Sequence, residues 1–252
     1  MDSFKIIARK VAGKLGFDIV RKNNLILNFH NNYYLRHTAR RLEHLSSLRI
    51  PVAGMTVLEV GAGIGDLSHY YIDRRCKITI TEARLENLQY LKKRFPDENI
   101  QYLNMESPSY LKEAPFDIVH CYGLIYHLSN PEQALQFLSS CCKKMLFLST
   151  CVSFANSNII NWVTENQSSL TQAISGTGCL PTRPWVFKKL SKLFKYVYIP
   201  KTQPNHEEFP IDWTAPEMHR ANLSRAIFIS SNIRIDNVML TEALIDHQTR
   251  SA

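Results

Sequence analysis

The chain of 252 residues is 45% hydrophobic and 21% charged, the composition of a globular protein long enough to bury a full core. It contains no apolar run near the roughly 20 residues that a membrane span needs, and no apolar core ahead of a small-residue cleavage site, so we expect neither a transmembrane segment nor a signal peptide. The net charge of +8 raises the question of whether its partners are anionic.

Most of the positive charge lies in the first 50 residues. A block of this kind attracts nucleic acid, an anionic lipid surface or an acidic glycan. The alternative is a helical face whose charges are merely solvated, and the scarcity of aromatic residues between the charges favours that alternative. The block contains three acidic and ten basic residues, and the basic ones are Lys5, Arg9, Lys10, Lys14, Arg21, Lys22, Arg36, Arg40, Arg41 and Arg49.

Helical periodicity runs through the same region. Residues 1–28 fit an amphipathic helix followed by a short apolar run. In residues 35–48 apolar side chains recur at helical spacing, with the arginines on or near an opposite face. Pro51 and Gly54 end this helix, so residues 1–50 are predicted to form an N-terminal helical cap. The predicted apolar stripe consists of Leu35, Ala39, Leu42, Leu45 and Leu48.

A strand over residues 56–60 leads into a glycine turn. The sequence from 57 to 67 is VLEVGAGIGDL, with glycines at alternate positions and an acidic residue, Glu59, two places before the first of them. Glycine allows a tight bend and a close approach to a ligand because it lacks Cβ. A dinucleotide-binding turn, G-x-G-x-x-G, requires glycine at position 66, where Asp66 stands. The pattern therefore argues against NAD.

Strands and helices alternate as far as residue 150, with short connections between them. Such alternation predicts a parallel, doubly wound sheet. After the glycine turn we expect helix 66–73, strand 77–81, helix 84–95, strands 100–103 and 116–122, helix 131–143 and strand 145–150.

The pattern changes after residue 150. Residues 153–183 are polar and rich in Ser, Asn and Gly, so we expect an insertion over the site. A helix at 184–194 and strands at 196–199 and 225–229 follow, and the two strands suit an antiparallel hairpin at the edge of the sheet. Residues 237–252 form a tail without a readable pattern.

Three side chains stand where chemistry is expected. Glu82 ends the second strand about 20 residues after the glycine turn, where a carboxylate can accept hydrogen bonds from both ribose hydroxyls of a nucleoside; a solvated surface glutamate is the alternative. The turn after strand 116–122 carries Tyr126, a candidate acceptor contact, and His127. An imidazole there can take a proton at neutral pH, or can serve only as a packing residue.

The second half of the chain offers rivals. Arg183, near a helix start, could clamp a carboxylate or a phosphate, and Trp185 beside it is a candidate acceptor contact. In the loop 203–213, His206 with Glu207 or Asp212 could form an oriented base; local hydrogen bonding within a surface loop is the alternative. His206 and Glu208, two positions apart, are too little to predict a metal site, so we expect none.

An acidic residue, a hydrophobic residue and G-x-G-x-G in this order resemble motif I of the class I S-adenosylmethionine (SAM) dependent methyltransferases, and the resemblance extends over residues 50–150. It implies a Rossmann-like, doubly wound sheet of seven strands, mostly parallel with one antiparallel strand, in a domain over 51–236. It implies SAM as the cofactor. The cofactor-binding residues that it implies are Glu59, Gly61, Ala62, Gly63, Gly65, Glu82, Ala83, Asn104, Met105, Cys121 and Tyr122.

Segments outside that range, at 37–45, 182–183 and 205–210, resemble a bacterial group of uncharacterised methyltransferases that are often neighbours of enzymes decorating sugars and surface glycans. We therefore expect O-methylation of a small polar acceptor such as a sugar or glycan, by in-line transfer with a histidine base. Two alternatives remain: an RNA methyltransferase that binds tRNA or rRNA through the basic N-terminal region, and a non-catalytic interaction protein with the same fold.

The six cysteines form no C-x-x-C pair, which argues against zinc ribbons and a disulfide framework. Reduced thiols, and hence a cytoplasmic location, are expected. The sequence leaves the oligomeric state open, with a homodimer as one option.

Overall fold

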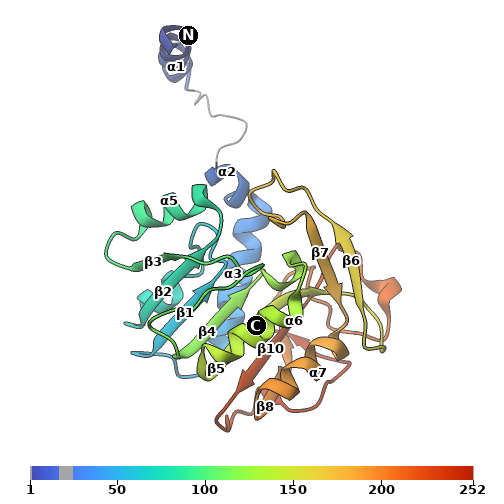
Figure 1. Cartoon of the computed structure of the whole chain (residues 1–252). Coiled ribbons are helices and arrows are strands. Elements are labelled where there is room, and N and C mark those ends of the chain that lie inside the picture. Colours follow the sequence, from blue (N-terminus) through green and yellow to red (C-terminus); the bar gives the residue numbers. More distant parts are fainter. Residues whose placement is uncertain (1, 17–24, 252) are drawn as a thin grey trace.

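The computed structural model describes residues 2–16 and 25–251 (Figure 1); residues 17–24 of the predicted cap and the last residue of the predicted tail lie outside the described residues. The helices are α1 (Asp2–Lys14), α2 (Leu25–Phe29), α3 (Asn32–Ser47), α4 (His69–Ile72), α5 (Leu85–Arg94), α6 (Pro131–Ser140), α7 (Arg183–Leu193) and the 3₁₀ turns η1 (Ile125–His127) and η2 (Pro216–Met218). The strands are β1 (Thr56–Val60), β2 (Lys77–Glu82), β3 (Asn99–Tyr102), β4 (Phe116–Tyr122), β5 (Cys142–Val152), β6 (Ile160–Thr164), β7 (Thr177–Pro181), β8 (Tyr196–Pro200), β9 (Thr202–Gln203), β10 (Ser224–Ser231), β11 (Leu240–Thr241) and β12 (Thr249–Arg250).

The central sheet has the strand order β11-β8-β10-β5-β4-β1-β2-β3. Strands β1 to β5 pair in parallel, whereas β10 is antiparallel to both of its neighbours. This confirms the predicted doubly wound sheet and its antiparallel β8–β10 pair. The prediction of seven strands is one short, because β11 from the tail adds an eighth at the edge of β8. A two-residue strand carries no periodicity that a sequence could reveal.

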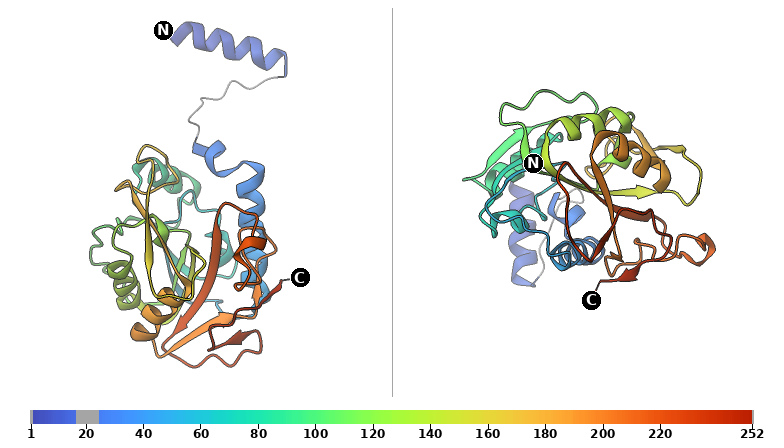
Figure 2. Two further views of the ribbon diagram at one scale, coloured as in Figure 1. Left: turned by 90° about the vertical axis from the view of Figure 1, so that its right-hand side faces the viewer. Right: turned by 90° about the horizontal axis from the view of Figure 1, so that it is seen from below.

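Helices cover both faces of this sheet (Figure 2). One layer of the core joins α3, α4 and α5 to side chains such as Val57, Ile80 and Ile118. The other joins α6 and α7 to Leu58, Val60 and neighbouring positions. Adjacent residues of β1 thus serve opposite layers, since successive side chains of a strand point to opposite faces. The carboxyl ends of the parallel strands remain free to line a site.

Capping side chains and prolines mark the starts of α6 and α7, the helices of the second layer. The side chain of Asn130 accepts a hydrogen bond from the amide of Gln133 at the start of α6, and Thr182 accepts one from Trp185 at the start of α7. Each helix also has proline in its first turn, where the missing N–H costs nothing. Within residues 2–16 and 25–251, no helix combines the length and apolarity that crossing a bilayer requires.

Helix α3 corrects the sequence analysis. The predicted stripe holds at Leu45 and Leu48, which are buried, but Leu35 is 47% exposed. The prediction that Arg41 lies on an outward face is wrong, because Arg41 is 9% exposed and shares the buried face with His37 and His44. Polar side chains thus form much of the inner face of this helix, and an apolar pattern could not find them.

The segment predicted as an insertion contains the hairpin β6–β7, a separate two-stranded sheet. Its connecting loop reaches from Glu165 to Gly176. The tail supplies β12, which pairs with β9 in another small sheet. The predicted domain boundaries at residues 50 and 236 stay predictions.

Candidate functional site

A cleft of about 1210 Å³, its open mouth included, lies at the carboxyl ends of β1, β2 and β4. Open α/β sheets bind their ligands at this edge, where neighbouring connections turn to opposite faces. Residues of α3, the glycine turn, η1, β10 and the β6–β7 loop all contribute to its walls.

The glycine turn forms the floor of the cleft. The amides of Gly61 and Ala62 both donate to the carbonyl of Thr81, at 3.0 Å each, which fixes the turn against β2. Gly61 and Gly63 line the cleft, and Gly63 has φ +61°, a conformation that favours glycine. Gly65 does not line the cleft. A Cβ at Gly65 would lie 2.5 Å from Phe95, so this glycine lets the turn pack on α5.

Glu82 lies at the end of β2, and its carboxylate lies beside the glycine turn. Its Oε2 accepts from the amide of Gly63 at 2.8 Å, and its Oε1 accepts from the amides of Ala83 and Arg84 at 2.9 and 2.8 Å. Burial raises the pKa of Glu82 above its ordinary value, although these three hydrogen bonds work in the opposite direction. The carboxylate is therefore oriented before a ligand arrives, and Glu82 and Ala83 both line the cleft.

The other residues predicted to bind the cofactor divide into two groups. Glu59, Asn104, Met105 and Tyr122 line the cleft. Glu59 is 2% exposed, and its Oε2 accepts from the hydroxyl of Ser68 at 2.5 Å. Cys121 does not line it; its side chain lies in the core, where burial raises the pKa of the thiol to about 12.

Arg41 is a cleft residue that the sequence analysis placed elsewhere. Its Nη2 has one long hydrogen bond, 3.4 Å to Thr38, and its buried Nε has no partner. Among the described residues, no carboxylate lies within 4.0 Å of its guanidinium. Burial and the charge of Arg225 lower its pKa to about 10. A buried cation without a counterion is costly, so this wall of the cleft is prepared for an anion.

The turn η1 brings Tyr126 and His127 into the lining of the cleft. The Nδ1 atom of His127 lies 2.5 Å from Oε2 of Glu165, at the start of the β6–β7 loop. Glu165 escaped the sequence analysis, because nothing in the chain marks two residues 38 positions apart as neighbours. Arg225 on β10 also lines the cleft, and its Nη2 donates to the hydroxyl of Tyr126 at 3.3 Å.

His206 and Glu207 lie behind the cleft. The side chain of His206 is fully buried, and its Nδ1 accepts from the amide of Glu208 at 3.3 Å. Glu207 forms an exposed ion pair with Arg36. Neither residue lines the cleft, and His37 stands between, with its ring 4.9 Å from that of His206.

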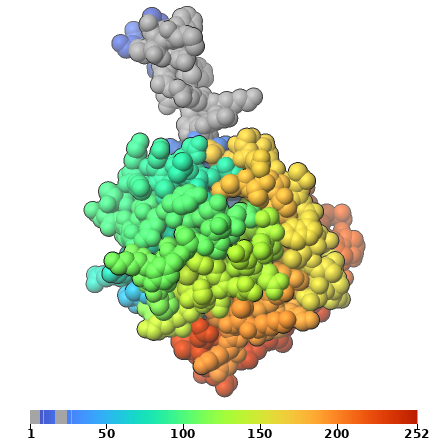
Figure 3. Space-filling model, viewed as in Figure 1, coloured from blue at the N-terminus to red at the C-terminus, as the bar shows by residue number. Residues whose placement is uncertain are grey.

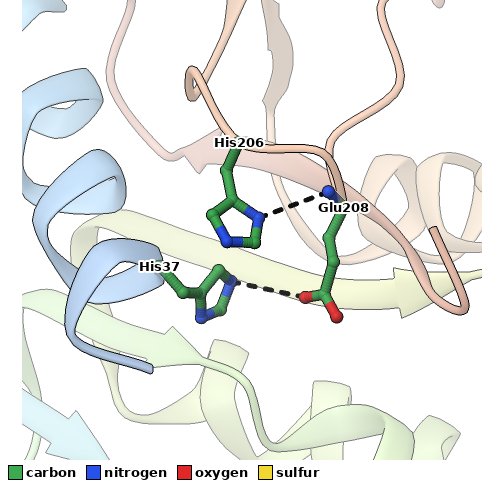
Figure 4. A group of neighbouring side chains, drawn as sticks. All are labelled: His37, His206 and Glu208. Carbon is green, nitrogen blue, oxygen red and sulfur yellow. Dashed lines mark hydrogen bonds and ion pairs between the residues drawn. The ribbon is translucent and has the colours of Figure 1, made fainter. Parts of the chain in front are cut away.

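His37, His206 and Glu208 offer potential ligand atoms within 4.8 Å of one another, and their side chains converge (Figure 4). Their surroundings oppose a cation. Oε2 of Glu208 accepts from Nε of Arg225 at 2.5 Å, so its charge is already matched. Burial, Arg41 and Arg225 lower the pKa of His37, and the positive charges of the two arginines would also repel a divalent ion. We interpret the cluster as neutral imidazoles packed beside a buried ion pair.

Arg183 and Trp185 do not line the cleft, and each has its contacts elsewhere. Arg183 donates to the carbonyl of Ile245 at 2.7 Å, and its guanidinium lies 4.1 Å from the ring centre of Trp213. Trp185 is buried in the core beneath α7. The structure brings neither of them to the cleft.

Comparisons with known proteins agree on the architecture. A protein-family model described as a methyltransferase domain matches residues 30–183. The N-terminal domain of EvdMO1 was solved with S-adenosylhomocysteine (SAH) bound, and its sequence is 17% identical to this one. The two structures superimpose with a TM-score of 0.58 over 77% of this chain and 80% of that chain. The same domain in the presence of SAH and D-fucose gives a TM-score of 0.59 at 17% identity, over 92% and 97% of the two chains.

A third solved structure, an S-adenosylmethionine dependent methyltransferase from Mesorhizobium loti, is 13% identical. It has a TM-score of 0.53 over 75% of this chain and 97% of that chain. At such low identities these structures establish a shared fold. No curated protein matches the sequence significantly.

Proposed function

The chain belongs to the methyltransferase family whose domain model spans residues 30–183, and from this premise we propose that it methylates a hydroxyl group of a small polar acceptor, such as a sugar or glycan. Its cofactor is SAM. What remains to be assigned is the part that each cleft residue plays and the kind of acceptor.

The cleft fits SAM at three points. The carboxylate of Glu82, already oriented by three amides, would accept the ribose hydroxyls. The backbone of Gly61 to Gly63 allows the methionine part to approach closely. The unpaired guanidinium of Arg41 would bind the carboxylate of the methionine part, because it is the one buried cation on the described cleft wall without a partner of opposite charge.

The single observation that carries the proposal is the position of His127. It lines the same cleft as the glycine turn, its Nδ1 is held by Glu165, and its Nε2 has no hydrogen-bond partner among the described residues. Bound SAM supplies an electrophilic methyl group, which an acceptor oxygen attacks in line. His127 would take the hydroxyl proton on Nε2 and release it to solvent afterwards.

The remaining wall suits an acceptor with several hydroxyl groups. Tyr34, Thr38, Tyr126 and Arg225 line it, so aromatic faces alternate with hydrogen-bonding groups. The N-terminal domain of EvdMO1, which shares the fold, was crystallised in the presence of SAH and D-fucose. This supports a sugar-like acceptor by analogy of fold alone.

Three of the arginines on which the RNA alternative depends are engaged elsewhere. Arg36 is paired with Glu207, Arg40 is paired with Glu43 at 2.6 Å, and Arg41 lies in the cleft. These contacts count against a phosphate-binding stripe along α3.

The test is SAH formation from SAM with two sets of acceptors: hydroxylated monosaccharides and their glycosides, and bulk tRNA. We expect turnover in the first set. Turnover on tRNA alone, falling steeply with salt, would contradict the proposal and favour the RNA alternative.

The pH dependence of SAH binding follows from Glu82. Ribose hydroxyls donate to the carboxylate form, and the pKa of Glu82 in the free protein lies above its ordinary value because of burial. Affinity is therefore full above that pKa and is lost as the pH falls through it, by up to about tenfold for each further unit. Calorimetric titration between pH 8 and 5 measures this loss, and a Glu82→Gln variant should lack it. An equally steep loss in Glu82→Gln would assign the titration to another group.

A further inference from the structure

The loop between β6 and β7 lies over the cleft and carries residues toward its mouth. Positions 170 to 174 of this loop line the cleft. In the space-filling view the atoms of the hairpin, in yellow, border those of the segment near residues 80–110, in teal and green (Figure 3). The loop thus forms part of the wall of the cleft.

Glu165 is the residue of this hairpin that touches His127. Its Oε2 accepts from the amide of Ala173 at 2.6 Å as well as facing Nδ1 of His127 at 2.5 Å. Both side chains are largely buried, with exposed fractions of 16% for His127 and 11% for Glu165. The absence of Cβ at Gly178 makes room for the carboxylate, since a Cβ there would collide with Oε1 of Glu165.

The carboxylate of Glu165 is charged at neutral pH. Burial alone would raise its pKa, but the hydrogen bonds from His127 and Ala173 outweigh burial, and the pKa lies below its ordinary value. A charged carboxylate beside Nδ1 holds the proton of a neutral imidazole on that nitrogen. Nε2 then carries the lone pair and faces the cleft as a proton acceptor.

We propose that Glu165 is the positioning residue for His127, and that the loop 165–176 is a lid over the cleft that holds this carboxylate against the base. The inference rests on the proposed function of His127. In the transfer step the acceptor oxygen forms its bond to the methyl carbon, the S–C bond breaks with its electron pair on sulfur, and the hydroxyl proton moves to Nε2. Glu165 remains ionised and stabilises the imidazolium.

Arg84 connects the lid to the ribose side of the cleft. Its Nη2 donates to the carbonyls of Gln167 and Gln172, at 3.2 and 2.8 Å, so one guanidinium holds two points of the loop. The amide of the same residue donates to Oε1 of Glu82 at 2.8 Å. The loop and the carboxylate proposed to hold the ribose are therefore joined through one residue, Arg84.

The first test is the tautomer of His127, measured by nitrogen-detected NMR of the SAH complex and assigned with His127→Gln. In the wild type we expect the proton on Nδ1. Glu165→Ala should move it mainly to Nε2, the tautomer that free imidazole prefers, whereas Glu165→Gln should keep it on Nδ1, because the amide oxygen still accepts. A carboxylate that only holds the loop would leave the tautomer unchanged in Glu165→Ala, and that result would overturn the proposal.

The second test is hydrogen exchange of the amides in 165–176, with and without SAH. We expect SAH to slow exchange by about fivefold or more in the wild type, and Arg84→Ala to abolish the slowing. Arg234→Ala, at an exposed position without a contact to the lid, is the matched control and should behave like the wild type. Equal slowing in Arg84→Ala would overturn the lid. Neither readout depends on turnover, so failure here is distinguishable from failure of His127 as the base.

Discussion

Replacing His127 with alanine is expected to lower kcat by about 10²- to 10⁴-fold, the usual contribution of a positioned general base. The affinity for SAH should stay close to that of the wild type, because the contacts proposed for the cofactor come from Glu82, the glycine turn and Arg41. Loss of kcat with unchanged cofactor binding is the signature of a group that acts only in the transition state. The measurement is SAH release under saturating SAM and acceptor.

His247→Ala provides the control for this experiment. The side chain of His247 is 69% exposed and faces Asp212 at 3.5 Å, outside the cleft. Its removal should leave kcat unchanged. A kcat for His127→Ala within a fewfold of the wild type would remove the histidine from the chemistry and leave it as a packing residue.

Replacing Arg41 with leucine is expected to change affinity and stability in opposite directions. Hydrogen bonds to a charged group contribute about 1.5 to 3 kcal/mol, so loss of the guanidinium should weaken SAH binding by about 10- to 100-fold. The free protein should become more stable, because an unpaired buried charge has been exchanged for an apolar side chain. Calorimetry gives the affinity, and urea unfolding without ligand gives the free energy of unfolding.

Arg40→Leu is the matched control, one residue away on the same helix. Arg40 is paired with Glu43 at the surface, and its side chain is 39% exposed. Neither affinity nor stability should change by more than about 0.5 kcal/mol, as is usual for surface substitutions. If Arg41→Leu bound SAH as tightly as Arg40→Leu, the methionine carboxylate would have to lie elsewhere in the cleft.

The fold and the floor of the site were open to prediction because their signals are local. The G-x-G-x-G turn, the strand leading to Glu82 and the regular alternation up to residue 150 each depend on neighbours within a few positions. Parallel pairing then brings the ends of β1, β2 and β4 to one edge without further information.

Of the walls of the site, the turn with Tyr126 and His127 could be predicted, but the rest could not, since it joins residues far apart in the chain. Arg41 on α3 and Arg225 on β10 line one cleft although 184 positions separate them. The inner face of α3 carries His37 and Arg41, and an apolar stripe is the wrong template for a helix that supplies polar groups to a pocket. A search for polar residues repeating at helical spacing would have selected His37, Arg41 and His44 together.

The loop 203–213 shows what composition leaves open. Its density of acids and histidines indicated proton transfer, yet the structure uses it to surround Arg225 with Glu208 and to cover His37. Composition alone does not distinguish groups gathered to support a buried ion pair from groups gathered to react.

Titration calorimetry of SAH into the wild type and Glu82→Ala tests the central claim most directly, namely that the sugar of the cofactor rests on Glu82 at the edge of the sheet. The account predicts one site per chain in the wild type and an affinity at least about tenfold weaker in Glu82→Ala. Glu86→Ala, which removes an exposed carboxylate four residues later on α5, should bind like the wild type. Equal affinity of Glu82→Ala and the wild type would contradict the account.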